Sequence, residues 1–281
     1  MSQVVLVTGC SEPTGFGALT CRRLMQRGHT PYATMRDPAG RSAVTAQALA
    51  AEGVHVSALD VADPEQVNEV VGAIVAAEGR IDAVVNNAAW VLGGALEETS
   101  AERLLRAFDV NVVGAHRVIL AVLPHMRAAG NGTIVQVSSV NGFYPEPIIG
   151  VYSATKHAMN AYSDALALEV EQFGIRVVVV EPGMFATGAH DRLDWEPAAL
   201  DPSGPYAPIR DAIWGGGPQG WDEDVFGDPG DAAEAIVGAI EDPATPLHLP
   251  VGVDALELSR DLHHATAVEA WLGSVREELK P

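Results

Sequence analysis

The sequence is poor in cationic side chains, and above all in lysine. Its 281 residues contain 17 Lys and Arg against 37 Asp and Glu, which gives a formal net charge of −20. Lys156 and Lys280 are the only lysines. A charge of this sign repels nucleic acids and anionic membranes. We therefore expect no nucleic-acid partner, and we interpret the acidic surface as an aid to solubility.

Cysteine and long apolar runs are scarce as well. Cys10 and Cys21 are too few for a disulfide framework and lack metal-ligand partners at a suitable spacing, so we expect reduced thiols and no metal site. There is no apolar run of about eighteen residues or more, and the opening "MSQVVLVTG" lacks the basic region and cleavage site of a signal peptide. These features predict a cytoplasmic protein without a membrane anchor.

Short β-branched runs alternate with longer helical patterns along the whole chain. With 48% hydrophobic residues the chain can bury the core of one large domain or two small ones, and we favour one domain over 1–281. The expected strands lie at 3–7, 30–35, 54–58, 82–86, 133–138, 175–180 and 247–250. Continuous apolar runs such as "RVVVVE" are typical of strands covered on both faces. The pattern predicts an α/β fold with a doubly wound, mostly parallel seven-stranded sheet of the Rossmann type.

A glycine-rich turn follows the first expected strand in "VLVTGCSEPTGFGALT". Gly9, Gly15 and Gly17 allow close backbone approach, and the following helix start offers free N–H groups to a pyrophosphate. Arg36 ends the second expected strand. A guanidinium there suits a ribose 2′-phosphate, whereas an acidic residue would bind the 2′-hydroxyl. The turn thus indicates a dinucleotide site that favours NADP, with a plain surface charge as the alternative for Arg36.

Three polar residues in the middle of the chain make a proton-transfer site. Tyr152 and Lys156 are four apart in "VYSATKHAMNAYSDAL" and so share a helix face, and Ser139 precedes Tyr152 by thirteen residues. A free tyrosine has a pKa near ~10, and a neighbouring ammonium is expected to lower it toward neutrality. Ser139 is expected to hydrogen-bond a substrate oxygen while a nicotinamide delivers hydride.

These motifs, in this order, make the sequence resemble the short-chain dehydrogenase/reductase family over nearly its whole length. Beyond the glycine turn and the Ser139, Tyr152 and Lys156 set, the resemblance rests on "LDVAD", "NNAA", "DVNVVG" and "EPGMFAT". The resemblance implies that Asn111 completes a catalytic tetrad by bending its helix and holding a water that links Lys156 to solvent. It also implies a homodimer or homotetramer.

The resemblance implies further cofactor contacts. Asp60 and Val61 would face the adenine, and Asn87 would lie along the adenosine ribose. The set from the glycine turn is Gly9, Ser11, Gly15, Phe16 and Gly17, and the set at the nicotinamide is Tyr152, Lys156, Pro182, Gly183, Phe185 and Thr187. "YATMRDP", "NVVG" and "LPVGVDA" are similar to the branch that includes retinol and 17β-hydroxysteroid dehydrogenases, which implies a lipophilic alcohol, ketone or aldehyde as substrate.

Three features depart from the regular pattern. Five residues separate Gly9 from Gly15 where the family has three, and we expect this insertion to bulge outward and leave Gly15, Phe16 and Gly17 at the helix start. Ala89 replaces a glycine, which costs little unless its φ is positive. Residues 184–230 are rich in Pro, Gly, Asp and aromatics, and we expect either a mobile lid over an apolar substrate or a loop whose aromatics pack on the domain.

The sequence therefore predicts an NADP(H)-dependent oxidoreductase that interconverts an alcohol and a carbonyl on a lipophilic small molecule. Two alternatives stay open at this point. One is an enzyme of the same kind that uses NAD, and the other is a non-catalytic nucleotide-binding scaffold with an altered glycine turn.

Overall fold

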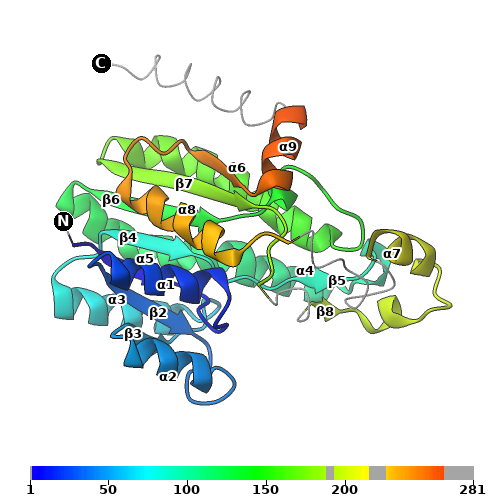
Figure 1. Ribbon diagram of the computed structural model, residues 1–281, viewed down its shortest axis with the longest axis horizontal. Helices are drawn as coiled ribbons and strands as arrows, with labels where there is room; N and C mark the ends of the chain where they lie inside the picture. Colours follow the sequence, from blue (N-terminus) through cyan, green and yellow to red (C-terminus); the bar gives the residue numbers. More distant parts are fainter. Residues whose placement is uncertain (1, 188–192, 215–225, 263–281) are drawn as a thin grey trace.

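The computed structural model describes residues 2–187, 193–214 and 226–262, and a seven-stranded sheet is its centre (Figure 1). The strand order is β3-β2-β1-β4-β6-β7-β9, and all neighbouring pairs are parallel. The strands are β1 Val4–Val7, β2 Thr30–Met35, β3 His55–Ala58, β4 Ala83–Asn86, β6 Gly132–Val137, β7 Ile175–Pro182 and β9 His248–Val251. All seven expected strands are confirmed, with ends that differ by one or two residues.

Helices cover both faces of the sheet. One core cluster joins the sheet to α1 Phe16–Gln26, α2 Ala43–Ala51 and α8 Pro229–Glu241. A second cluster joins the opposite face to α3 Pro64–Glu78, α5 Gly114–Ala129 and α6 Gly150–Glu171. The strands are apolar on both sides because both sides are covered. The doubly wound fold is confirmed.

Local sequence signals explain where several helices begin and end. The Asp63 side chain accepts hydrogen bonds from the backbone N–H groups of Glu65 and Gln66, Pro64 follows as the first helical residue, and Gly79 ends α3 with a φ of 73°. Helix α8 begins in the same way at Asp228 and Pro229. An acidic cap, a proline at the first position and a terminal glycine are each favourable at those places.

A long helical stretch, Ala101–Ala129, runs through α4 Ala101–Phe108, a π-type turn at Asp109–Val113, and α5. Its length and mean hydropathy of 1.4 meet the requirements of a membrane span, by length and composition alone. A core helix of a soluble protein meets the same requirements, and Val118, Ile119, Val122 and Met126 of α5 are fully buried in the core.

The segment 184–230, expected to be an irregular loop, contains regular structure. Its described parts include β8 Asp194–Trp195, a 3-10 turn at Pro197–Leu200, α7 Ala207–Trp214 and the start of α8. Strand β8 pairs in parallel with β5 Leu92–Gly93, and these elements lie together beyond one end of the main sheet (Figure 1). The expectation of an irregular loop is therefore wrong for the described residues of this segment. Residues 188–192 and 215–225 lie outside the described residues.

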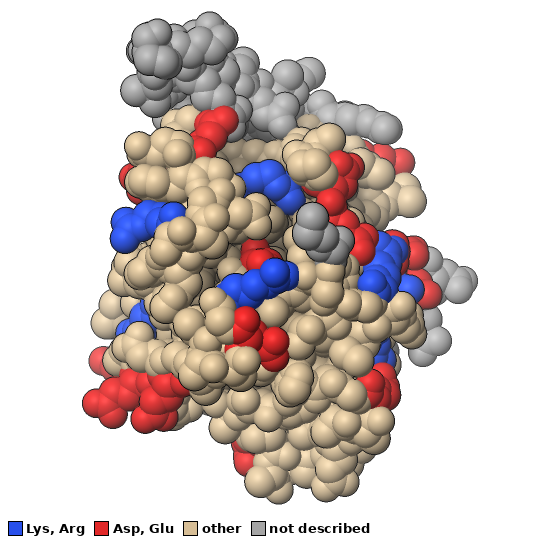
Figure 2. Space-filling model, turned by 90° about the vertical axis from the view of Figure 1, so that its left-hand side faces the viewer, with Lys and Arg blue, Asp and Glu red and all other residues tan. Residues whose placement is uncertain are grey.

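The remaining described elements are the 3-10 turns Leu96–Glu98 and Val140–Gly142, and α9 Val253–Leu262 after β9. Charges are mixed on the face shown in Figure 2, where the basic side chains lie apart and several have acidic neighbours. Ion pairs of the described residues include Arg27 with Glu234 and Arg80 with Asp82. This face has no continuous basic patch of the kind that binds a nucleic-acid backbone.

Candidate active site

A cavity of about 920 Å³ lies at the carboxyl ends of β1, β2, β4 and β6. In open α/β sheets this edge is where ligands bind. Predicted residues that line the cavity are Gly9, Ser11, Gly15, Phe16, Arg36, Asp60, Val61, Asn87, Tyr152, Lys156 and Thr187. The predicted residues Gly17, Asn111, Ser139, Pro182, Gly183 and Phe185 lie outside this lining. One pocket therefore gathers most of the predicted residues, and the others surround or support it.

The glycine turn is shaped by close backbone contacts. Gly9 has a φ of 75°, and a Cβ there would lie 2.7 Å from the Cα of Ala88. A Cβ on Gly17 would lie 2.8 Å from the Nδ2 of Asn87. The same Asn87 amide donates to the carbonyl oxygens of Thr8 (2.9 Å) and Gly9 (3.0 Å). Larger side chains at these glycines would separate the ends of β1 and β4.

The two extra residues of this turn lie on its outer side. Gly15 is the N-cap of α1, and its N–H donates to the Glu12 carbonyl at 3.1 Å, which closes a tight turn over Pro13 and Thr14. Both of these residues are exposed, and neither lines the cavity. The Pro13 carbonyl instead accepts a hydrogen bond of 2.7 Å from Arg22. The insertion thus lengthens the loop and leaves Gly15, Phe16 and Gly17 at the start of the helix.

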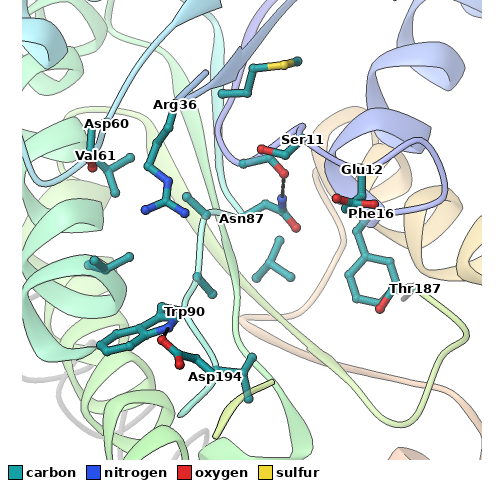
Figure 3. A pocket seen from close by; sticks show the side chains of 18 of the residues that line it. Ser11, Glu12, Phe16, Arg36, Asp60, Val61, Asn87, Trp90, Thr187 and Asp194 are labelled. Atoms are coloured by element: carbon teal, nitrogen blue, oxygen red, sulfur yellow. Dashed lines mark hydrogen bonds between the residues drawn. The ribbon is translucent and has the colours of Figure 1, made fainter. Parts of the chain in front are cut away.

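Arg36 extends from the end of β2 into the space between Val61 and Asn87 (Figure 3). No ion pair or hydrogen bond of its guanidinium occurs within the described part of the chain. Three further residues line the cavity next to it and were missed from the sequence: Asp37, Arg41 and Ser42. Their position directly after Arg36 was the available signal. This end of the cavity combines two guanidinium groups and a hydroxyl, which suit a phosphate, with the Asp37 carboxylate, which lies 4.0 Å from the Nε of Arg41.

Ser139, Tyr152 and Lys156 come together although thirteen residues separate the first two. Ser139 follows β6, its hydroxyl donates to the Asn141 Oδ1 at 3.2 Å, and it lies close enough to Tyr152 to act on the pKa of that phenol. The Nζ of Lys156 lies 5.5 Å from the Tyr152 ring centroid and donates to the Val137 carbonyl at 2.7 Å. Ser138, which was not predicted, lines the cavity instead of Ser139. The arrangement places a phenol, an ammonium and a hydroxyl beside one cavity wall.

The pKa of Tyr152 shifts in the direction opposite to the one expected from the sequence. Burial raises the pKa of Tyr152 to about 12, against a lowering by the hydrogen bond from Ser139. Burial also lowers the pKa of Lys156 to about 7. Because both groups are removed from water, the desolvation of each charged form outweighs their mutual attraction. Tyr152 is therefore protonated at neutral pH.

Asn111 lies at the centre of the π-type turn and is fully buried. Such turns often accompany a helix kink, and the bend implied by the resemblance stays a prediction. Its side chain holds the backbone of Trp90, accepting from the N–H at 2.7 Å and donating to the carbonyl at 2.9 Å. It also donates to Thr155 at 3.0 Å, and Thr155 in turn donates to the Tyr152 carbonyl at 2.7 Å. Asn111 thus links the β4 loop to the helix that carries Tyr152.

The predicted nicotinamide segment follows β7. Pro182 is the last residue of that strand, and the Phe185 ring packs edge-on against Phe16 with centroids 5.5 Å apart. Asp254 holds the turn: its carboxylate accepts from the Met184 N–H at 2.8 Å, and a Cβ on Gly183 would lie 2.0 Å from it. This role of Asp254 was missed, because seventy residues separate it from the turn. Of the segment itself, only Thr187 lines the cavity.

The other end of the cavity is lined by Trp90, Val91, Leu193 and Asp194 (Figure 3). Arg103 pairs with Asp194 at 3.0 Å and with Glu196 at 2.7 Å, and Glu196 is only 5% exposed. The Trp90 indole donates to Asp194 at 3.1 Å. Together with the β5–β8 pairing, these contacts form what we call the Arg103 clasp, defined by Trp90, Arg103, Asp194 and Glu196. Ala89 beside it has no positive φ, so its methyl group causes no strain.

A doubly wound parallel sheet with a cavity across its carboxyl edge defines the class of dinucleotide-binding proteins. Residues 3–197 match the family model described as short chain dehydrogenase. The chain therefore belongs to the short-chain dehydrogenase/reductase family and is an oxidoreductase of that family. Members of this family use NAD or NADP and act on small molecules.

Individual relatives agree with this assignment. A 3-ketodihydrosphingosine reductase of Bacteroides thetaiotaomicron is 39% identical over 189 residues, which is 67% of this chain and 66% of that protein. Human retinol dehydrogenase 8 is 35% identical over 199 residues, 68% of this chain and 61% of that protein. The chain thus matches about two thirds of the length of these relatives. A crystal structure of a short-chain dehydrogenase from Streptomyces avermitilis superimposes with a TM-score of 0.77 at 34% identity and covers 99% of this chain and 97% of the other.

Proposed function

We propose that the protein is an NADP(H)-dependent oxidoreductase that interconverts an alcohol and a ketone or aldehyde on a lipophilic small molecule. The observation that carries the proposal is that one cavity holds Arg36 at one end and the Tyr152–Lys156 pair at the other. The cavity walls fit a dinucleotide, since Gly9 and Gly17 leave no room for a Cβ and the start of α1 faces the turn. Arg36 would hold the 2′-phosphate, and Asp60 and Val61 would flank the adenine.

In this proposal Tyr152 is the general acid or base. A bound nicotinamide would supply or accept the hydride at the carbonyl carbon. Tyr152, protonated at neutral pH, donates its proton to the carbonyl oxygen in the reductive direction. Ser139 holds the same oxygen, and Lys156 in its charged form stabilises the phenolate that remains. Asn111 fixes the helix turn that positions these groups, and the proton relay through it stays a proposal.

The lipophilic substrate class rests on the walls near Tyr152. A small apolar cluster there contains Ile148, Ile149, Leu193 and Trp214, with Val91 and Tyr152 packed against it. Two relatives are named for 3-ketodihydrosphingosine and for retinol, both of which carry the reacting oxygen on a long hydrocarbon. We propose a lipophilic substrate of the same class for the present chain. We also propose a cytoplasmic location, based on the sequence. We further propose a homodimer or homotetramer, because members of the family commonly form oligomers.

Parallel fluorescence titrations with NADPH and NADH test the cofactor first. We expect NADPH to bind at least about tenfold more tightly, because a guanidinium forms charge-assisted hydrogen bonds with the 2′-phosphate. A screen of medium-chain ketones and aldehydes with the preferred cofactor then tests the reaction. Preference for NADH would select the NAD enzyme, and binding of neither nucleotide would select a non-catalytic scaffold.

A further inference from the structure

A buried polar network begins one helical turn beyond the catalytic pair. On α6, Tyr152 and Lys156 are followed at the same four-residue spacing by Asn160 and Asp164, so the four side chains share a helix face. Asn160 is 6% exposed and lines no part of the cavity. The proposed reaction has so far given no role to the second half of this polar face.

His248, the first residue of β9, closes the network from the other side. Its Nε2 lies 2.7 Å from the Oδ1 of Asp164, and its Nδ1 lies 3.0 Å from the Oε1 of Glu181. The side chains of His248 and Glu181 are 5% and 2% exposed. Although burial acts to lower it, the hydrogen bonds and charges of Asp164 and Glu181 raise the pKa of His248 to about 10. A buried imidazolium therefore lies between two carboxylates.

From Glu181 the network continues to the cavity wall. The Asn160 Nδ2 donates to the Glu181 Oε1 at 2.7 Å, and the Ser138 hydroxyl donates to the Asn160 Oδ1 at 2.5 Å. Because the carboxylate can only accept, it fixes which way the Asn160 amide faces. In that orientation the Asn160 Oδ1 faces Ser138 and accepts the hydrogen bond from its hydroxyl. Ser139, the next residue, stays outside this network, because its hydroxyl donates to the Asn141 Oδ1 at 3.2 Å within the following turn.

The network supports two loops at once. A Cβ on Gly142 would lie 2.7 Å from the Asn160 Nδ2 and 2.8 Å from the Ser138 Oγ, so the turn that follows Ser139 packs directly on the network. Glu181 immediately precedes Pro182, where the segment toward Thr187 leaves β7. A shift of the Asp164 or Glu181 carboxylate would therefore move both the turn after Ser139 and the segment that follows Pro182.

We propose that His248, Glu181 and Asn160 are positioning residues that hold the Ser139 turn and the nicotinamide segment in one fixed relation. The inference rests on the proposed function, and it adds a set of residues that act through Ser138, Gly142 and Pro182 without touching the reactants. Displacement of about 1 Å in such a supporting shell is enough to slow a reaction markedly.

The first test compares the binding of two ligands, NADPH and 2′-phospho-ADP-ribose, which keeps the second ribose but lacks the nicotinamide ring. In Glu181→Gln, the neutral amide no longer fixes the Asn160 orientation, and in His248→Gln two carboxylates lose the cation between them. We expect both variants to bind the fragment as wild type does but to bind NADPH at least about fivefold more weakly. Equal affinities of variants and wild type for both ligands would overturn the inference.

His29→Gln is a matched control. His29 is also buried, at 8% exposure, and its Nε2 lies 2.9 Å from the Oε1 of Glu241. It precedes β2, which is the second strand from the opposite edge of the sheet, and it lines no part of the cavity. We expect this variant to unfold at a lower temperature with unchanged affinity for both ligands. A purely structural network would give His248→Gln the same behaviour, with a lower unfolding temperature and normal NADPH binding.

A second measurement follows hydride transfer with 4-deuterated NADPH and a ketone that the wild type reduces. We expect kcat of Glu181→Gln to fall at least about tenfold with an increased isotope effect, because misplacement slows the chemical step. An unchanged kcat in folded Glu181→Gln would count against the inference. Failure of the proposed function is a separate outcome, since it appears in the wild type as absent nucleotide binding or turnover.

Discussion

The two ends of the cavity are built in different ways. The wall beside Arg36 consists of strand ends and a helix start, and its shape depends on backbone contacts at Gly9 and Gly17. The wall beside Leu193 has a β5–β8 backbone pair of only two residues in each strand, and the side chains of the Arg103 clasp bind to it. Backbone geometry follows from the fold, whereas a clasp of side chains depends on the identity of the residues that form it. The first wall suits a shared cofactor and the second a particular substrate.

The largest expected effect comes from Tyr152→Phe, at the residue proposed as the proton donor. Loss of the phenol removes the proton donor, and we expect kcat to fall by about a thousandfold. NADPH affinity should change by less than about threefold, because the ring that packs in the cavity is retained. Steady-state kinetics and a fluorescence titration measure the two quantities. Tyr144→Phe, at a side chain that is 42% exposed, should leave both unchanged.

Arg36→Glu should affect only the wall beside Arg36, which we call the cofactor wall. Placing a carboxylate against the 2′-phosphate should weaken NADPH binding by about a hundredfold, while NADH binding changes by less than about threefold. Titrations of the variant with both nucleotides give the ratio. Arg80→Glu makes the same change of net charge at a residue paired with Asp82, away from the cavity. If both variants lose NADPH equally, the effect is one of overall charge and not of a phosphate site.

Arg103→Gln should affect only the wall beside Leu193, which we call the substrate wall. It leaves the buried Glu196 carboxylate without its ion pair, which is costly because the group stays desolvated. We expect KM for the carbonyl substrate to rise about tenfold with NADPH affinity unchanged. Amide hydrogen exchange should accelerate at Asp194 and Glu196, whose N–H groups donate to Val91 and Gly93. Slow exchange of both amides in the variant would show that the β5–β8 pair is stable without the ion pairs of Arg103.

His248 predicts a pH dependence of stability. Its pKa is raised in the folded protein to about 10 from an ordinary value of 6.5, so its contribution is complete below pH 6.5 and is lost as the pH rises through 10. The difference in unfolding free energy between wild type and His248→Gln should therefore be largest at about pH 6.5 and below and should shrink as the pH rises toward 10. Urea unfolding across this range measures it. His125→Gln, at an exposed histidine, is the matched control.

The same contrast between walls explains what the sequence predicted. Gly9, Arg36, Tyr152 and Lys156 belong to patterns in which spacing and position within an α/β unit suffice. The Arg103 clasp joins residues more than ninety positions apart through side-chain contacts, and no local pattern marks such a pair. The pKa of Tyr152 was misjudged for a related reason, because spacing shows that Lys156 is near but not how deeply both groups are buried.

The smallest effect is expected from deletion of Pro13 and Thr14, which restores the usual three residues between the first two glycines. Both residues are exposed and lie outside the cavity lining, while Ser11, Glu12 and Gly15 remain. We expect the NADPH dissociation constant to change by less than about threefold, since loop length costs little when the loop ends keep their places. The hydrogen bond from Arg22 to Pro13 is lost, but that contact is exposed. A tenfold or larger change, about 1.4 kcal/mol, would mean that the extra turn shapes the pyrophosphate site, and the cofactor wall would then be as particular to this chain as the substrate wall.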